Sequence, residues 1–146
     1  MSQVQTAVDR FRNGYSCSQA IASTYGEWVG LDHDTAVRIA AGFGGGMGRM
    51  AGTCGAVTGA VMVLGLKHGS AEADDRQAKE HVYEMVRQFA RRFQARNQSL
   101  LCRDLLGCDI SSPAGFELAR QQKLIATICP KLVQDAAEIL EEMVQG

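Results

Sequence analysis

The sequence is poor in the features that mark membrane-embedded, secreted and nucleic-acid-binding proteins. Its formal net charge is −1, so charge alone favours neither nucleic acid nor an anionic membrane as a partner. The longest apolar run, from Cys54 to Leu66, has thirteen residues, whereas a membrane-spanning helix needs about twenty. The first residues show no basic segment followed by an apolar run. We therefore expect no signal peptide, no membrane partner, no nucleic-acid partner and a cytoplasmic location.

Proline and β-branched runs are also scarce, and no segment alternates as a strand does. The chain has two prolines and many Ala, Leu, Gln, Glu and Arg residues, a composition that favours helix. Its length of 146 residues suits one domain, spanning residues 1–146. We predict an all-α, compact single-domain bundle of about six to eight helices, with a glycine-rich segment at its centre.

Capping residues and hydrophobic periodicity place the expected helices along the chain. The first contains Val4, Val8 and Phe11, and the long amphipathic helix carries the stripe Val82, Val86, Phe89 and Phe93. That stripe and a small-residue helix face favour a homodimer if one of them stays exposed. The expected helices run from Val4 to Phe11, from Cys17 to about Val29 after a Ser16 cap, from Asp32 or Asp34 to Ala40, from a Thr53 cap to Leu66, from Ala71 to about Asn97, from Ser99 to Gly107, from Pro113, and from Pro130 to Met143.

Half of the glycines lie in one segment, which reads G-F-G-G-G-M-G-R-M-A-G-T-C-G-A-V-T-G-A from Gly42 to Ala60. Glycine loses the most backbone freedom on folding, so such a run indicates an unusual turn or a close approach of backbone. Gly55 and Gly59 have the spacing that lets another helix pack closely. Gly44, Gly45 and Gly46 fit a backbone that wraps a sulfur site or approaches the backbone of a partner, and with Gly55 they are the candidate cofactor-binding residues. No Lys-Ser/Thr follows the run, which excludes a P-loop.

The five cysteines fall mainly at expected helix starts. Cys17 follows Ser16, Cys54 follows Thr53, Cys102 lies in the turn after Ser99, and Cys129 precedes Pro130. The positive end of a helix dipole lowers the pKa of a thiol, so these positions suit reactive or ligating sulfurs. A buried cysteine that only packs is the alternative for each, above all for Cys108.

The remaining polar residues give weaker signals. Four arginines of the long helix either bind an anion or nucleic acid, or form a charged surface, and the charged surface is the favoured interpretation: Arg87, Arg91, Arg92 and Arg96. The sequence contains no Ser-His-Asp order, paired carboxylate site or HExxH motif, so a hydrolase has no support.

Several segments together resemble the C_GCAxxG_C_C family. They are N-G-Y-S-C-S-Q-A, the glycine-rich run above, C-R-D-L-L-G-C-D and C-P-K-L-V, in the family's order and over most of the chain. The family name spells Gly-Cys-Ala-x-x-Gly, where this chain has Thr-Cys-Gly-Ala-Val-Thr-Gly. The resemblance implies a redox-active protein and a link to iron–sulfur binding. By motif, the name-giving cysteines are Cys17, Cys54, Cys102 and Cys129, and Cys108 is additional.

Three functions remain open. In the leading hypothesis, a thiol-dependent oxidoreductase or electron-transfer protein, Cys54 is the attacking thiolate and Cys17 or Cys129 resolves it, with an unknown redox partner. In the second, Cys17, Cys54, Cys102 and Cys129 hold an iron–sulfur cluster or another soft metal, with Cys108 as a further ligand. In the third, the protein is a non-catalytic helical interaction protein whose cysteines belong to its core.

Overall fold

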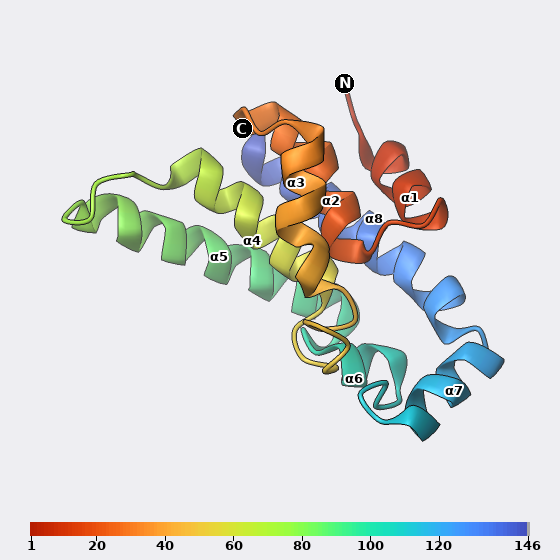
Figure 1. Ribbon diagram of the computed structural model, residues 1–146. Coiled ribbons are helices and arrows are strands. Elements are labelled where there is room, and N and C mark those ends of the chain that lie inside the picture. The colour runs from red at the N-terminus through yellow and green to blue at the C-terminus, as the bar shows by residue number, and fades with distance from the viewer. Residues whose placement is uncertain (146) are drawn as a thin grey trace.

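A computed structural model of the protein describes residues 1–145. This range contains no strand, only an isolated bridge between Thr53 and Leu101, and the prediction of an all-α single domain is confirmed (Figure 1). The eight α-helices of the described range are α1 (Val4–Arg12), α2 (Cys17–Gly26), α3 (His33–Ala40), α4 (Gly55–His68), α5 (Arg76–Asn97), α6 (Cys102–Leu106), α7 (Pro113–Gln121) and α8 (Leu124–Val144), with short 3-10 helices at Glu27–Val29 and Ala41–Phe43.

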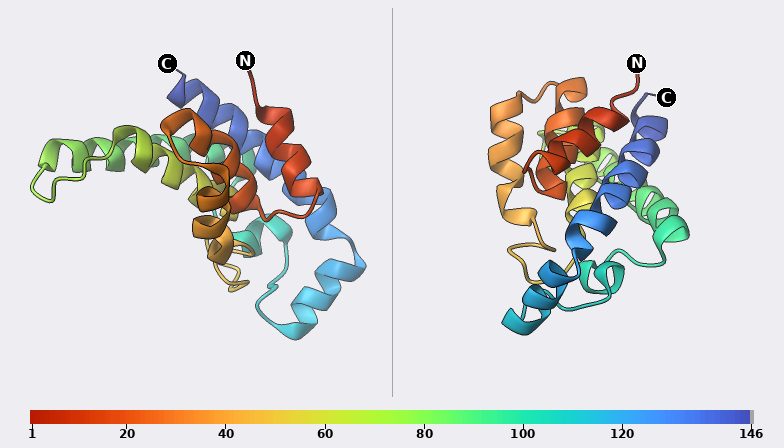
Figure 2. Two further views of the ribbon diagram at one scale, coloured as in Figure 1. Left: turned by 45° about the horizontal axis from the view of Figure 1, so that its top comes forward. Right: turned by 90° about the vertical axis from the view of Figure 1, so that its right-hand side faces the viewer.

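Helix α2 is the central element of the bundle. It packs against α1, α3, α4 and α8, while α5 packs against α4 and α8. Helices α4 and α5 form a long hairpin that projects from the bundle (Figure 1). Helices α6 and α7 and the start of α8 form a lobe at the end opposite the two chain termini (Figure 2). Within the described residues, none of the helices has the length and apolar character needed to span a bilayer.

Most predicted helix ends are confirmed because the capping side chains act as expected. Ser16 and Gln19 form a reciprocal capping box at the start of α2. Asp32 accepts the backbone N–H of Thr35 at the start of α3, and Pro113 lies in the first turn of α7 as predicted, after a Ser112 cap that was not predicted. Gly107 ends α6 in the left-handed conformation, with φ of 72°.

Two predicted helix starts were wrong by a few residues. Helix α4 begins at Gly55 with Cys54 as its N-cap, so Thr53 is not the cap. Helix α5 begins at Arg76 instead of Ala71, because the Asp75 carboxylate accepts the N–H of Ala78 and caps the N-terminus of the helix.

The predicted start of the last helix at Pro130 was also wrong. Helix α8 begins at Leu124, and Pro130 lies inside it. Proline has no N–H, so the carbonyl of Ala126 loses its usual helical donor at this point. Cys129 is consequently a residue of the helix interior and not an N-cap, which leaves three family cysteines at helix starts.

The glycine-rich segment forms a left-handed turn between α3 and α4. Gly46 has φ of 71°, and a Cβ there would lie 2.5 Å from the backbone nitrogen of Gly52. The turn is closed by bonds from the N–H of Ala51 to Gly45 and from the N–H of Gly52 to Gly46. The predicted unusual turn is confirmed, and its consecutive residues of positive φ are Gly45, Gly46, Met47, Gly48 and Arg49.

Two glycines of α4 bring this helix close to α2. A Cβ at Gly55 would lie 2.9 Å from the backbone nitrogen of Ser18, and one at Gly59 would lie 2.9 Å from the Ser18 carbonyl oxygen. A side chain at either position would push the two helix backbones apart. The expected close helix packing at these glycines is therefore confirmed.

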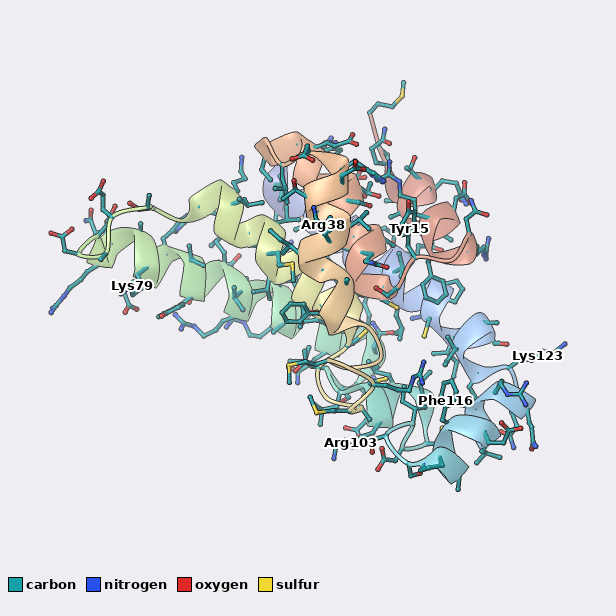
Figure 3. The ribbon with its side chains drawn as sticks, in the orientation of Figure 1. Tyr15, Arg38, Lys79, Arg103, Phe116 and Lys123 are labelled. Atoms are coloured by element: carbon teal, nitrogen blue, oxygen red, sulfur yellow. The ribbon has the colours of Figure 1, made fainter. Side chains whose placement is uncertain are left out.

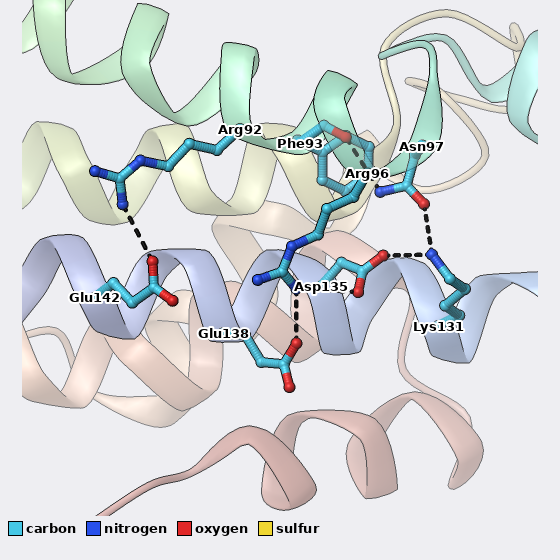
Figure 4. Close-up of polar contacts among 8 residues, drawn as sticks. All are labelled: Arg92, Phe93, Arg96, Asn97, Lys131, Asp135, Glu138 and Glu142. Atoms are coloured by element: carbon cyan, nitrogen blue, oxygen red, sulfur yellow. Dashed lines mark hydrogen bonds and ion pairs between the residues drawn. The ribbon is translucent and has the colours of Figure 1, made fainter.

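The faces considered for a homodimer are used within the chain. Phe89 and Phe93 of α5 are fully buried, and the small-residue face of α4 packs on α2. Ion pairs join α5 to α8, including one of 2.7 Å between Arg96 and Glu138 (Figure 4). Val82 and Val86 of that stripe are half-buried, and the homodimer itself stays a prediction.

The arginines of α5 pair with acidic side chains of the same chain, which favours the charged-surface interpretation. The pairs are Arg87 and Arg91 with Glu84, Arg92 with Glu142, and Arg96 with Asp135 and Glu138.

Candidate functional site: a cavity lined by thiols

A cavity of about 580 Å³ lies where the starts of α2 and α4 meet the glycine-rich turn, α6, α7 and the first half of α8. Its wall is mainly apolar, and Phe116 projects from α7 towards it (Figure 3). All four family cysteines line this one cavity: Cys17, Cys54, Cys102 and Cys129. The fold thus brings together sulfurs from four helices that are far apart in the sequence.

Cys54 lies at the N-terminus of α4, where its environment favours a thiolate. The pKa of Cys54 is lowered, chiefly by a hydrogen bond from the Cys17 thiol and further by the backbone N–H groups of Ala56 and Val57, against the opposing effect of burial. No side-chain capping bond of standard length forms at this helix start, so the two amides act on the buried sulfur mainly through their charge distribution.

Cys17 is the first residue of α2, and its thiol lies between two other sulfurs. Hydrogen bonds with Cys129 and with Cys54, followed by burial, raise the pKa of Cys17 well above its ordinary value. The raised pKa favours the protonated form of Cys17, and the lowered pKa favours the thiolate form of Cys54.

Cys129 reaches the cluster from the interior of α8, one residue before Pro130. The argument from helix dipoles does not apply to it, because it lies more than a turn from the helix start. Its sulfur contacts Cys17, and it lines the cavity. Packing of α8 across α1 and α2, and not local capping, places this residue at the site.

Cys102 lines the same cavity but stands apart from the three contacting sulfurs. Its backbone N–H donates to the carbonyl of Gly52 at 2.7 Å, which ties α6 to the glycine-rich turn. Burial, followed by the nearby Cys54 and Cys129, raises the pKa of Cys102 to about 12. A thiol held in its protonated form is a poor nucleophile, so Cys102 is unsuited to attack.

Cys108 lies outside the cavity lining. Its thiol donates to the carbonyl of Gly115 at 3.6 Å, a contact between the α6–α7 loop and α7. This contact supports the packing interpretation of Cys108 over a role as ligand.

The four glycines predicted as site residues all line the cavity, and they have two different structural roles. Gly44, Gly45 and Gly46 form part of its wall within the left-handed turn. Gly55 permits the close approach of α4 to α2, because a Cβ there would lie 3.3 Å from Cβ of Cys17. Without this approach the sulfurs of Cys17 and Cys54 would not meet.

Two lining residues escaped the sequence analysis. The Arg49 guanidinium lies 4.0 Å from the centre of the Phe116 ring, a cation–π contact from the glycine-rich turn to α7. The signal in the sequence was the one charged residue inside the glycine-rich run, but nothing there indicated its aromatic partner 67 positions later.

A four-thiolate set has the right chemistry for a soft metal or an iron–sulfur cluster. Among residues 1–145, however, no three His, Cys, Asp or Glu side chains are grouped closely enough to hold a metal ion. The four cavity cysteines would have to rearrange before they could act together as ligands.

A helical bundle whose cavity gathers reduced cysteines defines a class of thiol-bearing proteins suited to redox or soft-metal chemistry. Residues 15–143 match the family model described as "Putative redox-active protein (C_GCAxxG_C_C)". The chain belongs to this family, and the resemblance inferred from the sequence is confirmed. Comparison with curated proteins and with solved structures gave no match.

Proposed function

We propose that the protein is a thiol–disulfide oxidoreductase in which Cys54 attacks and Cys17 resolves. The placement of Cys54 and Cys17 at one cavity, at the starts of α4 and α2, carries this proposal. The lowered pKa of Cys54 and the raised pKa of Cys17 support their different roles. Family membership supports a redox role in general. The third hypothesis, cysteines that only pack, gives no reason for all four family cysteines to line one cavity.

The reaction needs only the two cysteines and a substrate disulfide. The Cys54 thiolate attacks one substrate sulfur, a mixed disulfide forms, and the other substrate sulfur leaves as a thiolate. The leaving thiolate takes the proton of Cys17. The Cys17 sulfur then attacks Sγ of Cys54 and releases the second substrate sulfur as a thiolate. One protein thiolate, one protein thiol and one substrate disulfide become one protein disulfide, one substrate thiol and one substrate thiolate, and the steps reverse when a reductant is supplied.

Cys17 is a better resolving residue than Cys129, the other candidate. Cys17 contacts the Cys54 sulfur, whereas Cys129 contacts Cys17 and does not affect the pKa of Cys54. Cys129 would then act in a second thiol–disulfide exchange. Its thiol attacks the Cys17 sulfur of the Cys17–Cys54 disulfide, which frees Cys54 and leaves a Cys17–Cys129 disulfide.

Peptide mapping after brief treatment with a limiting amount of a small disulfide tests the proposal. We expect a Cys17–Cys54 disulfide in the wild type and a trapped mixed disulfide on Cys54 in the Cys17→Ser variant. Cys54→Ser should remove both products. Cys108→Ser is the matched control, because that thiol lies outside the cavity lining, and it should react as the wild type does. First attack at Cys102 or Cys129 would refute the assignment.

Soft-metal binding is the second candidate, and one observation favours it: all four family cysteines line the same cavity. Anaerobic reconstitution with iron and sulfide, followed by metal analysis, separates the two functions. A four-thiolate site loses its metal when Cys102 is replaced by Ser, whereas the thiol pair keeps its exchange reaction in that variant.

The setting of this chemistry is part of the proposal. We infer a cytoplasmic protein, where glutathione and thioredoxin systems keep thiols reduced, with an as yet unknown redox partner and no nucleic acid. The prediction of a homodimer is tested by analytical ultracentrifugation, in which a species of 15.7 kDa at micromolar concentration would remove it.

A further inference from the structure

The charge of the cavity wall indicates what kind of disulfide enters it, and this inference rests on the proposed function. Arg49 is the one charged side chain among the described residues that line the cavity, and no acidic side chain lines it. A positively charged substrate would therefore find no carboxylate there, while an anionic one would find a guanidinium.

Arg49 is held at the cavity without a carboxylate partner. It makes no ion pair with any described residue, whereas Arg96 and Arg120 each pair with an acidic side chain. Its contact with Phe116 places the guanidinium over an aromatic face, and the guanidinium N–H donors of Arg49 bond to no described residue. Arg49 also adopts φ of 61°, a left-handed conformation that residues other than glycine rarely adopt.

The glycine-rich turn adds unpaired backbone donors beside this cation. From Met47 to Gly52 every N–H of the turn donates to a backbone carbonyl. The N–H groups of Gly45 and Gly46, two residues that line the cavity, donate to no acceptor within residues 1–145. Consecutive free amides and a guanidinium, here on one turn that lines the cavity, are the donors that proteins use for carboxylates and other anions.

We propose that the cavity binds a low-molecular-weight disulfide, or its thiol, that carries a carboxylate. The carboxylate would lie at Arg49 and the amides of Gly45 and Gly46, and the disulfide at Cys54. The cavity volume of about 580 Å³ falls in the range of small-molecule sites. The apolar remainder of the wall suits the carbon chain of such a molecule.

Three small disulfides of equal chain length test this substrate class: dithiodipropionate, which is dianionic, bis(2-hydroxyethyl) disulfide, which is neutral, and cystamine, which is dicationic. The rate of mixed-disulfide formation on Cys54 is measured for each in the Cys17→Ser background. Each rate is divided by the rate of the same disulfide with 2-mercaptoethanol, which removes differences in leaving-group reactivity.

We expect the normalised rate for dithiodipropionate to exceed that for cystamine by about tenfold at low salt, and the preference to shrink as salt is added. Arg49→Gln should remove the preference, and Arg49→Lys should keep part of it because the charge is retained. Arg38→Gln is the matched control: it removes one exposed positive charge from α3, away from Phe116, and should leave the preference unchanged (Figure 3).

The outcomes separate the two proposals. Equal normalised rates for the three disulfides, or an equal loss of preference in Arg38→Gln and Arg49→Gln, would overturn the anionic substrate class while leaving thiol exchange intact. If none of the three disulfides reacts at Cys54, the proposed function itself fails.

Discussion

Cys54 differs from the other cavity cysteines in its surroundings and not in its residue type. Its sulfur faces a thiol donor and two backbone amides at the start of α4. Burial raises the pKa of Cys102, which lacks such donors, to about 12. At the residue scale, hydrogen bonds to the charged form decide which buried thiol becomes a nucleophile.

The order in which the cysteines are alkylated follows from these surroundings. With a limiting amount of iodoacetamide near pH 7, we expect Cys54 to be modified before Cys17 and Cys102, because the thiolate is the reacting form and the pKa values of the other two thiols are raised. Mass spectrometry of digested samples over time gives the order. Modification of Cys102 before Cys54 would contradict the assigned pKa directions.

The contribution of Cys17 to the thiolate can be isolated with two substitutions. Cys17→Ala removes the donor that lowers the pKa of Cys54 most, so the alkylation rate of Cys54 should begin to rise only at higher pH than in the wild type. Cys17→Ser retains a hydroxyl donor at the same place and should shift the profile less. The pH dependence of the alkylation rate is the measurement, and identical profiles for the two variants would count against a hydrogen bond from Cys17 to Cys54.

At the scale of elements, the contact between α2 and α4 assembles the site. A Cβ at Gly55 would lie 2.9 Å from the backbone nitrogen of Ser18 and would separate the two helices. We expect Gly55→Ala to lower the free energy of unfolding by about 1–3 kcal/mol and to slow formation of the Cys17–Cys54 disulfide. Denaturant unfolding and quantified disulfide formation test both effects.

Gly65→Ala provides the control within the same helix. No neighbouring atom would lie within 4 Å of a Cβ at that position. Alanine has the higher helix propensity, so this substitution should raise stability by up to about 1 kcal/mol and leave disulfide formation unchanged. Equal destabilisation by the two substitutions would show that close helix approach is not the cause.

A histidine pair gives the hairpin of α4 and α5 a pH dependence. His81 Nε2 and His68 Nδ1 lie 3.1 Å apart, and burial, then the charges of His81 and Lys67, lower the pKa of His68. The unfolded chain therefore binds the proton more readily, so stability should fall as the pH drops below about 6.5, the ordinary value for histidine. His68→Gln should make the free energy of unfolding less dependent on pH in that window. If the variant and the wild type show the same pH dependence, His68 is not its cause.

The sequence was sufficient where local chemistry decides an element. Caps such as Ser16 and Asp32 and the periodicity of apolar residues predicted helices that the structure contains. The predicted helix start at Pro130 was wrong. Proline is common in the first turn of a helix, but here the tertiary packing of α8 accommodates it in the helix interior. Cys129 reached the cavity through that packing, which no local pattern encodes.

At the scale of the whole molecule, the four family cysteines converge on one cavity although they span most of the chain. Their grouping could be proposed from the resemblance, but the order of their contacts could not, because it depends on how α2, α4 and α8 cross. The pairing of Arg49 with Phe116 likewise requires the left-handed turn and α7 to meet, a contact between distant parts of the chain.

Native mass spectrometry of protein purified without oxygen tests the central claim most directly. A thiol–disulfide mechanism predicts bare polypeptide that loses about 2 mass units for each disulfide on mild oxidation and regains them with a reductant, with the first disulfide joining Cys17 and Cys54. Added mass equal to iron and inorganic sulfide, lost in the Cys102→Ser variant, would contradict that mechanism and establish the four-thiolate cluster in its place.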